Sequence, residues 1–390
     1  MGSLIFLSEA LEDLKRQARY RSLRPVRGPQ APRVAVAGRE VVLLSSNDYL
    51  GLAGNPSLKD AAIYALERYG CGAGASRSIS GTMEIHLQLE EKIAHFKGCE
   101  AALLFSSGYM ANLGLLTTLV SEGDLILSDE FNHASIIDGC RLSRAEVWVY
   151  RHRDMDHLNY LLNVSSHHRK LIVTDGVFSM EGDITPLPQI KELADRYGAL
   201  IMLDDAHATG VLGKCGRGTA EHFGLANHIE IQMGTLGKAL GGCGAYVAGS
   251  RVLIDYLINH CRTFMYTTAL PPASAATAMA ALEIVDSEPQ RRERLWDNTY
   301  HFSKGLQKLG FNTLSSETPI IPILIGDNAL TMEADHRLME RGIFAQGIRP
   351  PTVPPKSSRL RTSLMATHTK EDLDLALDGF REVGRELNLI

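Results

Sequence analysis

The chain reads Gly-Thr-Leu-Gly-Lys-Ala-Leu-Gly-Gly over residues 234–242 and, upstream, Asp-Asp-Ala-His over residues 204–207. Glycines let a backbone adopt positive φ and come close to a bulky ligand. An amine that is kept out of water has a lowered pKa and becomes nucleophilic. The pattern therefore predicts that Lys238 presents its amine to the carbonyl group of a cofactor and forms a Schiff base.

Two other interpretations of this segment can be compared with the first. A phosphate-binding P-loop needs a glycine six residues before the lysine and a serine or threonine after it. Gln232 and Ala239 occupy those positions, so the P-loop motif is not satisfied. A structural glycine-rich turn that carries an exposed lysine remains open for Lys238 taken alone.

Outside this segment, apolar strands alternate with helical patterns. Such alternation predicts an α/β fold with a mostly parallel sheet that is covered by helices on both faces. The expected strands are 101–105, 125–128, 146–150, 171–174, 200–203, 229–233 and 243–248, and the expected helices include 56–69, 83–97, 187–197 and 272–285. Gly198 is predicted to end the helix 187–197.

Polar residues follow several of these strands. In open α/β sheets, ligands bind beyond the carboxyl ends of the strands. Alone, an aspartate there can cap a helix and a histidine can be a hydrogen-bonded surface residue. Together, these residues predict a site at one edge of the sheet: Ser106, Ser107, Gly108, His133, Asp175, Asp204 and His207.

The organisation changes near the Ser287-Glu288-Pro289 break. Beyond it we expect helices at 291–309, 331–341 and 370–387 and strands at 320–325, 343–346 and 360–364. The predicted organisation is an N-terminal arm at 1–50, a large domain at 51–287 and a small α+β domain at 288–390.

Composition excludes several classes of function. The net charge of −5 offers no basic field for nucleic acid or an anionic membrane. Basic residues between Lys15 and Arg33 adjoin Glu9 and Glu12, which favours a solvated face, although one arginine could bind a carboxylate or phosphate.

The six cysteines form no Cys-x-x-Cys pair, so we expect neither a zinc site nor a disulfide framework. No segment reaches the length of a membrane span, and the cytosol is the simplest location.

Five segments together resemble the α-oxoamine synthase family of fold-type I pyridoxal-phosphate (PLP) enzymes. They are residues 46–52 (Ser-Asn-Asp-Tyr-Leu-Gly-Leu), 174–183 (Thr-Asp-Gly-Val-Phe-Ser-Met-Glu-Gly-Asp), 204–210 (Asp-Asp-Ala-His-Ala-Thr-Gly), 234–241, and 348–354 (Ile-Arg-Pro-Pro-Thr-Val-Pro) with Arg359-Leu360-Arg361. The resemblance spans nearly the whole chain. It implies a PLP-dependent transferase with a large domain and a small C-terminal domain, and it implies no metal.

The resemblance also implies roles for individual residues around pyridoxal 5'-phosphate. Lys238 would hold the cofactor and act as the base and acid at Cα, and Asp204 would pair with the pyridine nitrogen. His133 would stack on the ring, with His207 and Ser179 near the phenolic oxygen. The phosphate would bind Gly108, Tyr109 and Thr235. Thr267 and Thr268 would reach the phosphate of a neighbouring subunit, which implies a homodimer.

On the substrate side, Arg361 resembles the residue that holds the amino-acid carboxylate, and Asn47, Arg21, Thr352 and His133 match other substrate positions. The segment 349–354 favours the branch that condenses L-alanine with pimeloyl-CoA or pimeloyl acyl carrier protein. The products would be 8-amino-7-oxononanoate, CO2 and a thiol, as a step of biotin biosynthesis.

Other members of the family share the same cofactor residues. Asp175 stands where some relatives have glutamate, and the turn at 354–357 differs from the expected Pro-x-Gly form. A 2-amino-3-ketobutyrate CoA ligase, acting on glycine and acetyl-CoA, or another α-oxoamine synthase is therefore the alternative. A Rossmann oxidoreductase is disfavoured, since Arg77 stands where the third glycine of its fingerprint belongs. A DNA-binding regulator is disfavoured because about forty N-terminal residues show no helix-turn-helix pattern.

Overall fold

The computed structural model describes residues 4–390, which form two compact units. The terminal unit contains the chain up to residue 51, residues 180–183 and residues 293–390. The central unit contains residues 52–179 and 184–292. The sequence does not predict the short excursion of residues 180–183 into the terminal unit.

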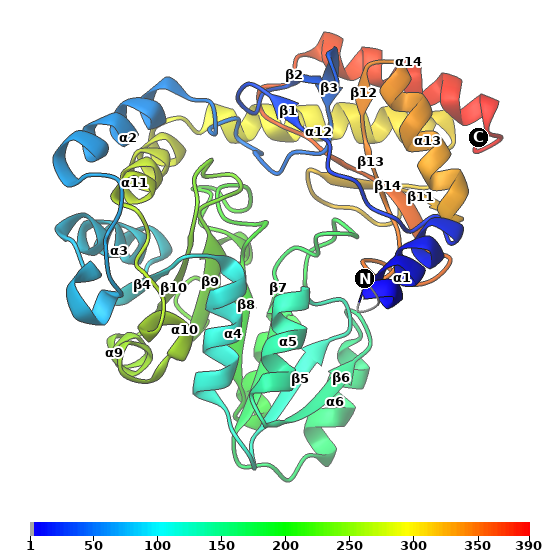
Figure 1. Ribbon diagram of the computed structural model, residues 1–390. Helices are drawn as coiled ribbons and strands as arrows, with labels where there is room; N and C mark the ends of the chain where they lie inside the picture. Colours follow the sequence, from blue (N-terminus) through cyan, green and yellow to red (C-terminus); the bar gives the residue numbers. More distant parts are fainter. Residues whose placement is uncertain (1–3) are drawn as a thin grey trace. The chain divides into compact units, whose positions relative to one another are not determined.

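A seven-stranded sheet forms the middle of the central unit (Figure 1). Its strand order is β4-β10-β9-β8-β7-β5-β6. The neighbours from β9 to β6 are parallel, whereas β10 runs antiparallel to both β4 and β9. This confirms the predicted mostly parallel sheet. The strands are β4 (Ala101–Phe105), β5 (Leu125–Asp129), β6 (Glu146–Tyr150), β7 (Lys170–Asp175), β8 (Leu200–Asp204), β9 (Ile231–Thr235) and β10 (Ala245–Gly249).

Helices bury both faces of this sheet, because side chains alternate along each strand. On β8, Met202 belongs to one apolar cluster, and Ile201 and Leu203 belong to another. The first cluster includes residues of α4 (Gly108–Leu119), α5 (Ala134–Leu142), α9 (Arg251–His260) and α10 (Arg262–Met265). The second includes residues of α6 (Met155–Val164), α7 (Leu187–Tyr197) and α8 (Thr219–His222). Gly198 ends α7 at φ 63°, as predicted.

Three further helices of the central unit pack together (Figure 1). They are α2 (Pro56–Tyr69), α3 (Glu84–Lys97) and α11 (Pro272–Ser287). A single π-helical turn, Arg77–Gly81, precedes α3. Within residues 4–390, no helix combines the length and the apolar composition that crossing a bilayer would need.

The terminal unit holds two small sheets. One has the order β1-β2-β3-β12 and the other the order β11-β14-β13. The strands are β1 (Val26–Arg27), β2 (Arg33–Val36), β3 (Arg39–Leu43), β11 (Ile320–Gly326), β12 (Ile343–Phe344), β13 (Gln346–Ile348) and β14 (Ser358–Ser363). The helices are α1 (Ile5–Arg16), α12 (Gln290–Leu309), α13 (Asn328–Glu340) and α14 (Lys370–Glu386), of which α12 begins in the central unit and enters the terminal unit at Glu293.

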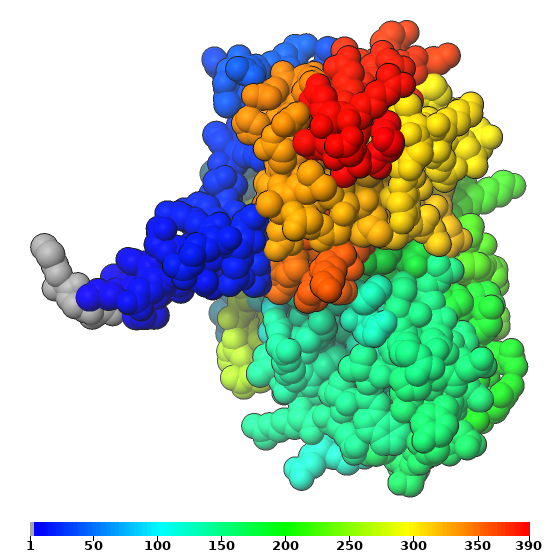
Figure 2. Space-filling view, turned by 90° about the vertical axis from the view of Figure 1, so that its right-hand side faces the viewer, coloured from blue at the N-terminus to red at the C-terminus, as the bar shows by residue number. Residues whose placement is uncertain are grey.

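Two predictions for this unit need correction. The single strand expected at 343–346 is wrong: β12 pairs with β3 in one sheet, and β13 pairs with β14 in the other. The strands β1 to β3 are absent from the sequence prediction, because short strands carry little periodicity of their own. Helix α1 lies at the surface, where Ile5 and Phe6 are 58% and 63% exposed (Figure 2).

Candidate active site

Loops at the carboxyl ends of the parallel strands surround a cavity of about 190 Å³ in the central unit. Strands β8 and β9 end at Asp204 and Thr235, and helix α4 begins at Gly108. The predicted residues at its wall are Gly108, Tyr109, His133, Asp175, Ser179, Asp204, His207, Thr235 and Lys238. The structure thus brings residues that are distant in sequence into one site.

Asp204 is held at both carboxylate oxygens. Its Oδ2 accepts a hydrogen bond from Asn112 Nδ2 at 2.7 Å, and its Oδ1 accepts one from the backbone N–H of Ala206 at 2.8 Å. The residue is only 4% exposed. Because it is buried and fixed, this carboxylate is suited to bind an N–H or cationic group of a ligand.

His133 caps the N-terminus of α5. Its Nδ1 lies 2.7 Å from Ser135 Oγ, and its backbone N–H donates to Asp175 Oδ2 at 3.0 Å. Burial lowers the pKa of His133, and the charge of Lys238 lowers it further, against the opposing effect of Asp204. The neutral imidazole is therefore favoured, and its contact with Ser135 fixes its orientation.

Asp175 ends β7 directly beside Asp204, its partner in the β7–β8 register. Burial raises the pKa of Asp175 well above its ordinary value, and the neighbouring Asp204 charge adds to the rise. Two adjacent buried carboxyl groups rarely ionise together. The surroundings therefore favour the neutral form of the Asp175 carboxyl group.

Another part of the cavity wall has the features of an anion site. The N-terminus of α4 presents backbone N–H groups at Gly108 and Tyr109. A Cβ added at Gly108 would lie 2.8 Å from Thr235 Cγ2, so the space admits only a glycine. Thr235 Oγ1 is buried and has no hydrogen-bond partner among residues 4–390. A phosphate group would satisfy both this hydroxyl and the helix N–H groups.

Two polar residues of the cavity wall, Asn112 and Ser135, were not predicted from the sequence. Asn112 binds Asp204 and Ser135, and Ser135 binds His133. Asn112 lies one helical turn after Gly108, and it is a polar residue within an apolar helix. That polar interruption is the signal that could have identified it.

Of the predicted substrate residues, His133 lies at the cavity wall of the central unit, whereas the other four lie in the terminal unit and form two pairs. Arg361 Nη2 donates to Asn47 Oδ1 at 3.1 Å, and its Nη1 donates to Ser363 Oγ at 2.9 Å. Arg21 Nη2 donates to Thr352 Oγ1 at 3.1 Å. Arg361 is 7% exposed, so its guanidinium is held in place before any ligand binds.

Thr267 and Thr268 lie apart from the cavity wall. The carbonyl of Thr268 accepts a hydrogen bond from Ser106 Oγ at 3.3 Å, and Thr268 forms an isolated bridge with Ser76. Within the described chain these two threonines therefore do not contribute to the predicted cofactor site.

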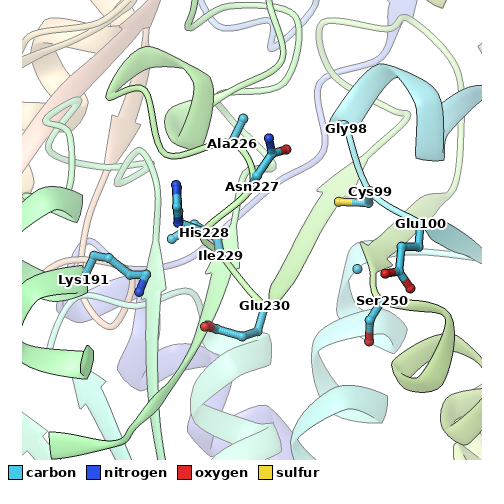
Figure 3. Close-up of a pocket in the computed structure, with 11 residues that line it drawn as sticks. Gly98, Cys99, Glu100, Lys191, Ala226, Asn227, His228, Ile229, Glu230 and Ser250 are labelled. Atoms are coloured by element: carbon cyan, nitrogen blue, oxygen red, sulfur yellow. The ribbon is translucent and has the colours of Figure 1, made fainter. Parts of the chain in front are cut away.

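A larger cavity, of about 490 Å³, lies beside Glu230, just before β9, and Gly249, at the end of β10. Figure 3 shows Lys191 and His228 on one side of it and Cys99 on another. Of the described residues that line it, none is a predicted site residue. Cavity volume therefore does not identify the candidate active site in this molecule. The convergence of the predicted polar side chains does.

Comparison with known proteins identifies the family of the chain. Residues 39–380 match the model of the family described as aminotransferase class I and II. The chain is 54% identical to an 8-amino-7-oxononanoate synthase of Symbiobacterium thermophilum over 99% of both chains. It is 55% identical to one of Geobacter sulfurreducens, over 97% of this chain and 98% of that protein.

Among solved structures, a serine palmitoyltransferase variant from S. paucimobilis with bound PLP-myriocin aldimine superposes with a TM-score of 0.94. It is 31% identical, and the match covers 99% of this chain and 98% of that one. These matches confirm the predicted fold type and the predicted relationship. The chain belongs to the aminotransferase class I and II family, and within it to the α-oxoamine synthases.

Proposed function

We propose that the chain is a PLP-dependent acyltransferase that condenses L-alanine with a pimeloyl thioester. The products are 8-amino-7-oxononanoate, CO2 and a free thiol, in biotin biosynthesis. The observation that carries this proposal is identity above 50%, along essentially the whole chain, to proteins named for that product. The cytoplasm, where activated thioesters are made, is the proposed location.

PLP fits the cavity of the central unit. Its phosphate would bind the α4 N-terminus and the unpaired Thr235 hydroxyl, and its ring would lie against His133. Asp204 would keep a proton on the pyridine nitrogen, while Ser179 and His207 would contact the ring substituents. When bound, PLP supplies an electron sink that stabilises negative charge at the amino-acid Cα.

Lys238 is proposed as the group that moves the proton at Cα. It removes the Cα proton of L-alanine, and Cα then forms a bond to the thioester carbonyl while the C–S bond breaks and the thiolate leaves. The bond from Cα to the carboxylate then breaks and releases CO2, and Lys238 returns the proton to Cα. Lys238 removes one proton from Cα and returns one proton to Cα, so its protonation state is the same before and after each turnover.

Arg361 is proposed to orient the amino acid. A planar guanidinium binds a carboxylate through two parallel hydrogen bonds, which a lysine cannot do. The bond that breaks must lie perpendicular to the conjugated ring, so the grip on the carboxylate also selects that bond. Asn47 holds the guanidinium at 3.1 Å and so fixes its plane.

Arg21 and Thr352 are proposed to receive the acyl substrate. They are already hydrogen-bonded to each other, and Arg21 is exposed, so it is accessible to a charged group at the far end of an acyl chain. A pimeloyl group ends in a carboxylate or its ester. Either acyl carrier, CoA or acyl carrier protein, is compatible with this assignment.

A second copy of this chain is the proposed partner. Thr267 and Thr268 lie away from the cavity of their own chain, next to Tyr266, which is 71% exposed. Ile79 in the π-helical turn is 80% exposed. Burying these apolar side chains against a second copy would let the threonines complete its phosphate site. Sedimentation should show a dimer of the holoenzyme, and a fully active monomer would contradict this.

The acyl donor is tested by the release of thiol from matched substrate pairs. We expect pimeloyl-CoA with L-alanine to give a higher kcat/KM than acetyl-CoA with glycine or palmitoyl-CoA with L-serine. Each buried methylene contributes about 0.8 kcal/mol, so acetyl-CoA loses most of the acyl binding energy. If acetyl-CoA with glycine is preferred, the chain is a ketobutyrate ligase. If palmitoyl-CoA with L-serine is preferred, it is a serine palmitoyltransferase.

A further inference from the structure

A buried ion pair lies in the central unit, next in sequence to the Asp204 carboxylate. Lys97, the last residue of α3, donates from Nζ to Asp205 Oδ2 at 2.9 Å. The two side chains are 1% and 0% exposed. Nζ also donates to the carbonyl of Arg217, and the backbone N–H of Thr219 donates to both oxygens of Asp205 at 3.2 and 3.3 Å.

The charged form of Lys97 is favoured, and the Asp205 carboxylate is closely enclosed. Burial is the largest single effect on the pKa of Lys97 and lowers it. The charge and hydrogen bond of Asp205, together with Tyr246 and Cys99, raise this pKa by more in total, so it lies above its ordinary value. A Cβ added at Gly218 would lie 2.1 Å from Asp205 Oδ2, and one added at Gly176 would lie 2.6 Å from Oδ1. The carboxylate therefore has little room to turn.

Asp204 and Asp205 face opposite sides of the sheet edge. Asp204 binds Asn112 of α4, whereas Asp205 binds Lys97 of α3 and the start of α8. Side chains of successive residues alternate at the end of a strand. The Asp205 side chain thus holds the backbone segment that carries Asp204, from the face opposite the one that Asp204 occupies.

Stability alone is a weak reason for such a pair. Desolvating two charges is costly, and replacing a buried ion pair by apolar residues of similar volume is often neutral or stabilising. Loss of a single partner, in contrast, leaves an uncompensated buried charge. The pair therefore calls for a role other than stability.

We propose that Lys97 and Asp205 are positioning residues that hold the 204–207 turn, so that the Asp204 carboxylate is aimed at the pyridine nitrogen of PLP. This rests on the proposed cofactor role of Asp204. The anchor acts through the backbone: Asp205 N–H donates to the carbonyl of Met233 on β9, and its own carbonyl accepts from Ala208 and Thr209. Without the buried charge pair, the side-chain anchor of this turn is lost.

The test compares PLP affinity with stability in the holoenzyme. Asp205→Asn and the double variant Lys97→Met/Asp205→Leu are measured beside Leu162→Ala, a buried residue of α6 outside the site. PLP dissociation is followed by absorbance on dilution, Tm by calorimetry, and the ring environment by visible circular dichroism. At metal sites, loss of a residue that supports a metal ligand typically weakens metal affinity by about 10-fold or more. We therefore expect the PLP Kd to rise by roughly tenfold.

The double variant separates positioning from stability. We expect it to recover the Tm of the wild type while its PLP Kd stays raised and its visible dichroism stays altered. Leu162→Ala should lower Tm and leave both cofactor readouts unchanged. The proposal is overturned if the double variant binds PLP as the wild type does, or if Leu162→Ala weakens PLP to the same extent.

If the double variant does not accumulate in soluble form, the isosteric Asp205→Asn variant is compared with Leu162→Ala instead. A PLP Kd that is raised no more than in Leu162→Ala would then overturn the proposal. The acyl donor does not enter this experiment. A wrong assignment of the donor would therefore leave the outcome for Lys97 and Asp205 intact.

Discussion

The amide of Asn112 donates to Asp204 Oδ2 at 2.7 Å and to Ser135 Oγ at 2.9 Å, so one side chain of α4 ties the carboxylate to the start of α5. Asn112 is 1% exposed. A hydrogen bond to a charged group contributes about 1.5–3 kcal/mol. This contact therefore matters for the orientation of Asp204.

We predict that Asn112→Leu slows Cα hydrogen exchange of L-alanine in heavy water by about tenfold or more, because Asp204 loses one of its donors. Exchange is followed by proton NMR of the holoenzyme. Leu162→Ala is the control, since it removes a buried side chain of α6 outside the cavity and leaves the Asp204 contact. Equal rates in Asn112→Leu and wild type would refute the role of this contact.

Asp204→Asn should still bind PLP and should lose nearly all Cα exchange. An amide is nearly isosteric with the carboxylate, so the shape of the cavity is kept, but it cannot stabilise a protonated pyridine nitrogen. The yellow cofactor is measured by absorbance and the exchange by NMR in the same sample. Undiminished exchange would count against the assigned role.

Lys238 is predicted to be the lysine that carries the cofactor. Borohydride reduction of the holoenzyme, digestion and mass analysis should place the modification on the peptide that contains residues 234–242. A Lys238→Ala variant should give no such adduct. Labelling of another lysine in the wild type would overturn the assignment.

Arg361→Lys should raise the KM for L-alanine by about tenfold to a hundredfold and also lower kcat, because the bidentate grip fixes the bond that breaks. Steady-state kinetics at saturating acyl thioester measure both constants. Arg292→Lys serves as the control: this buried arginine binds the carbonyls of Val285 and Lys214 instead. A raised KM in both variants would show a general effect of losing a buried guanidinium.

We expect the buried His368 to contribute to the pH dependence of the free energy of unfolding. Its Nδ1 accepts from Met365 N–H at 2.9 Å, and its Nε2 donates to the carbonyl of Leu43 at 3.0 Å. Burial lowers the pKa of His368 to about 4. Between about 6.5 and 4 the unfolded chain binds more protons at this residue, so stability is complete above about pH 6.5 and falls as the pH drops towards 4.

The expected loss from His368 is about 3 kcal/mol across that range. Urea unfolding of the wild type and His368→Gln at a series of pH values measures it. The variant should show a pH dependence that is weaker by this amount. Parallel curves for the two proteins would contradict the assignment.

The sequence alone predicted the mostly parallel central sheet and brought part of the cavity wall to one edge of it. Apolar strands that alternate with helices predict a mostly parallel sheet, and parallel strands place their carboxyl ends at one edge. His133, Asp175 and Asp204 are therefore predicted to lie in one site, and the family resemblance adds Thr235. The glycines around Lys238 are local requirements of the backbone, and these too can be recognised in a sequence.

Contacts between side chains of different helices and strands could be known only from the tertiary structure. Asn112 meets Asp204, and Lys97 meets Asp205, over separations in sequence that no local periodicity encodes. The short strands β12 and β13 join different sheets, because pairing partners, and not local propensity, settle where such short segments go. Local patterns fix which way a side chain points, while its partner depends on how distant elements pack.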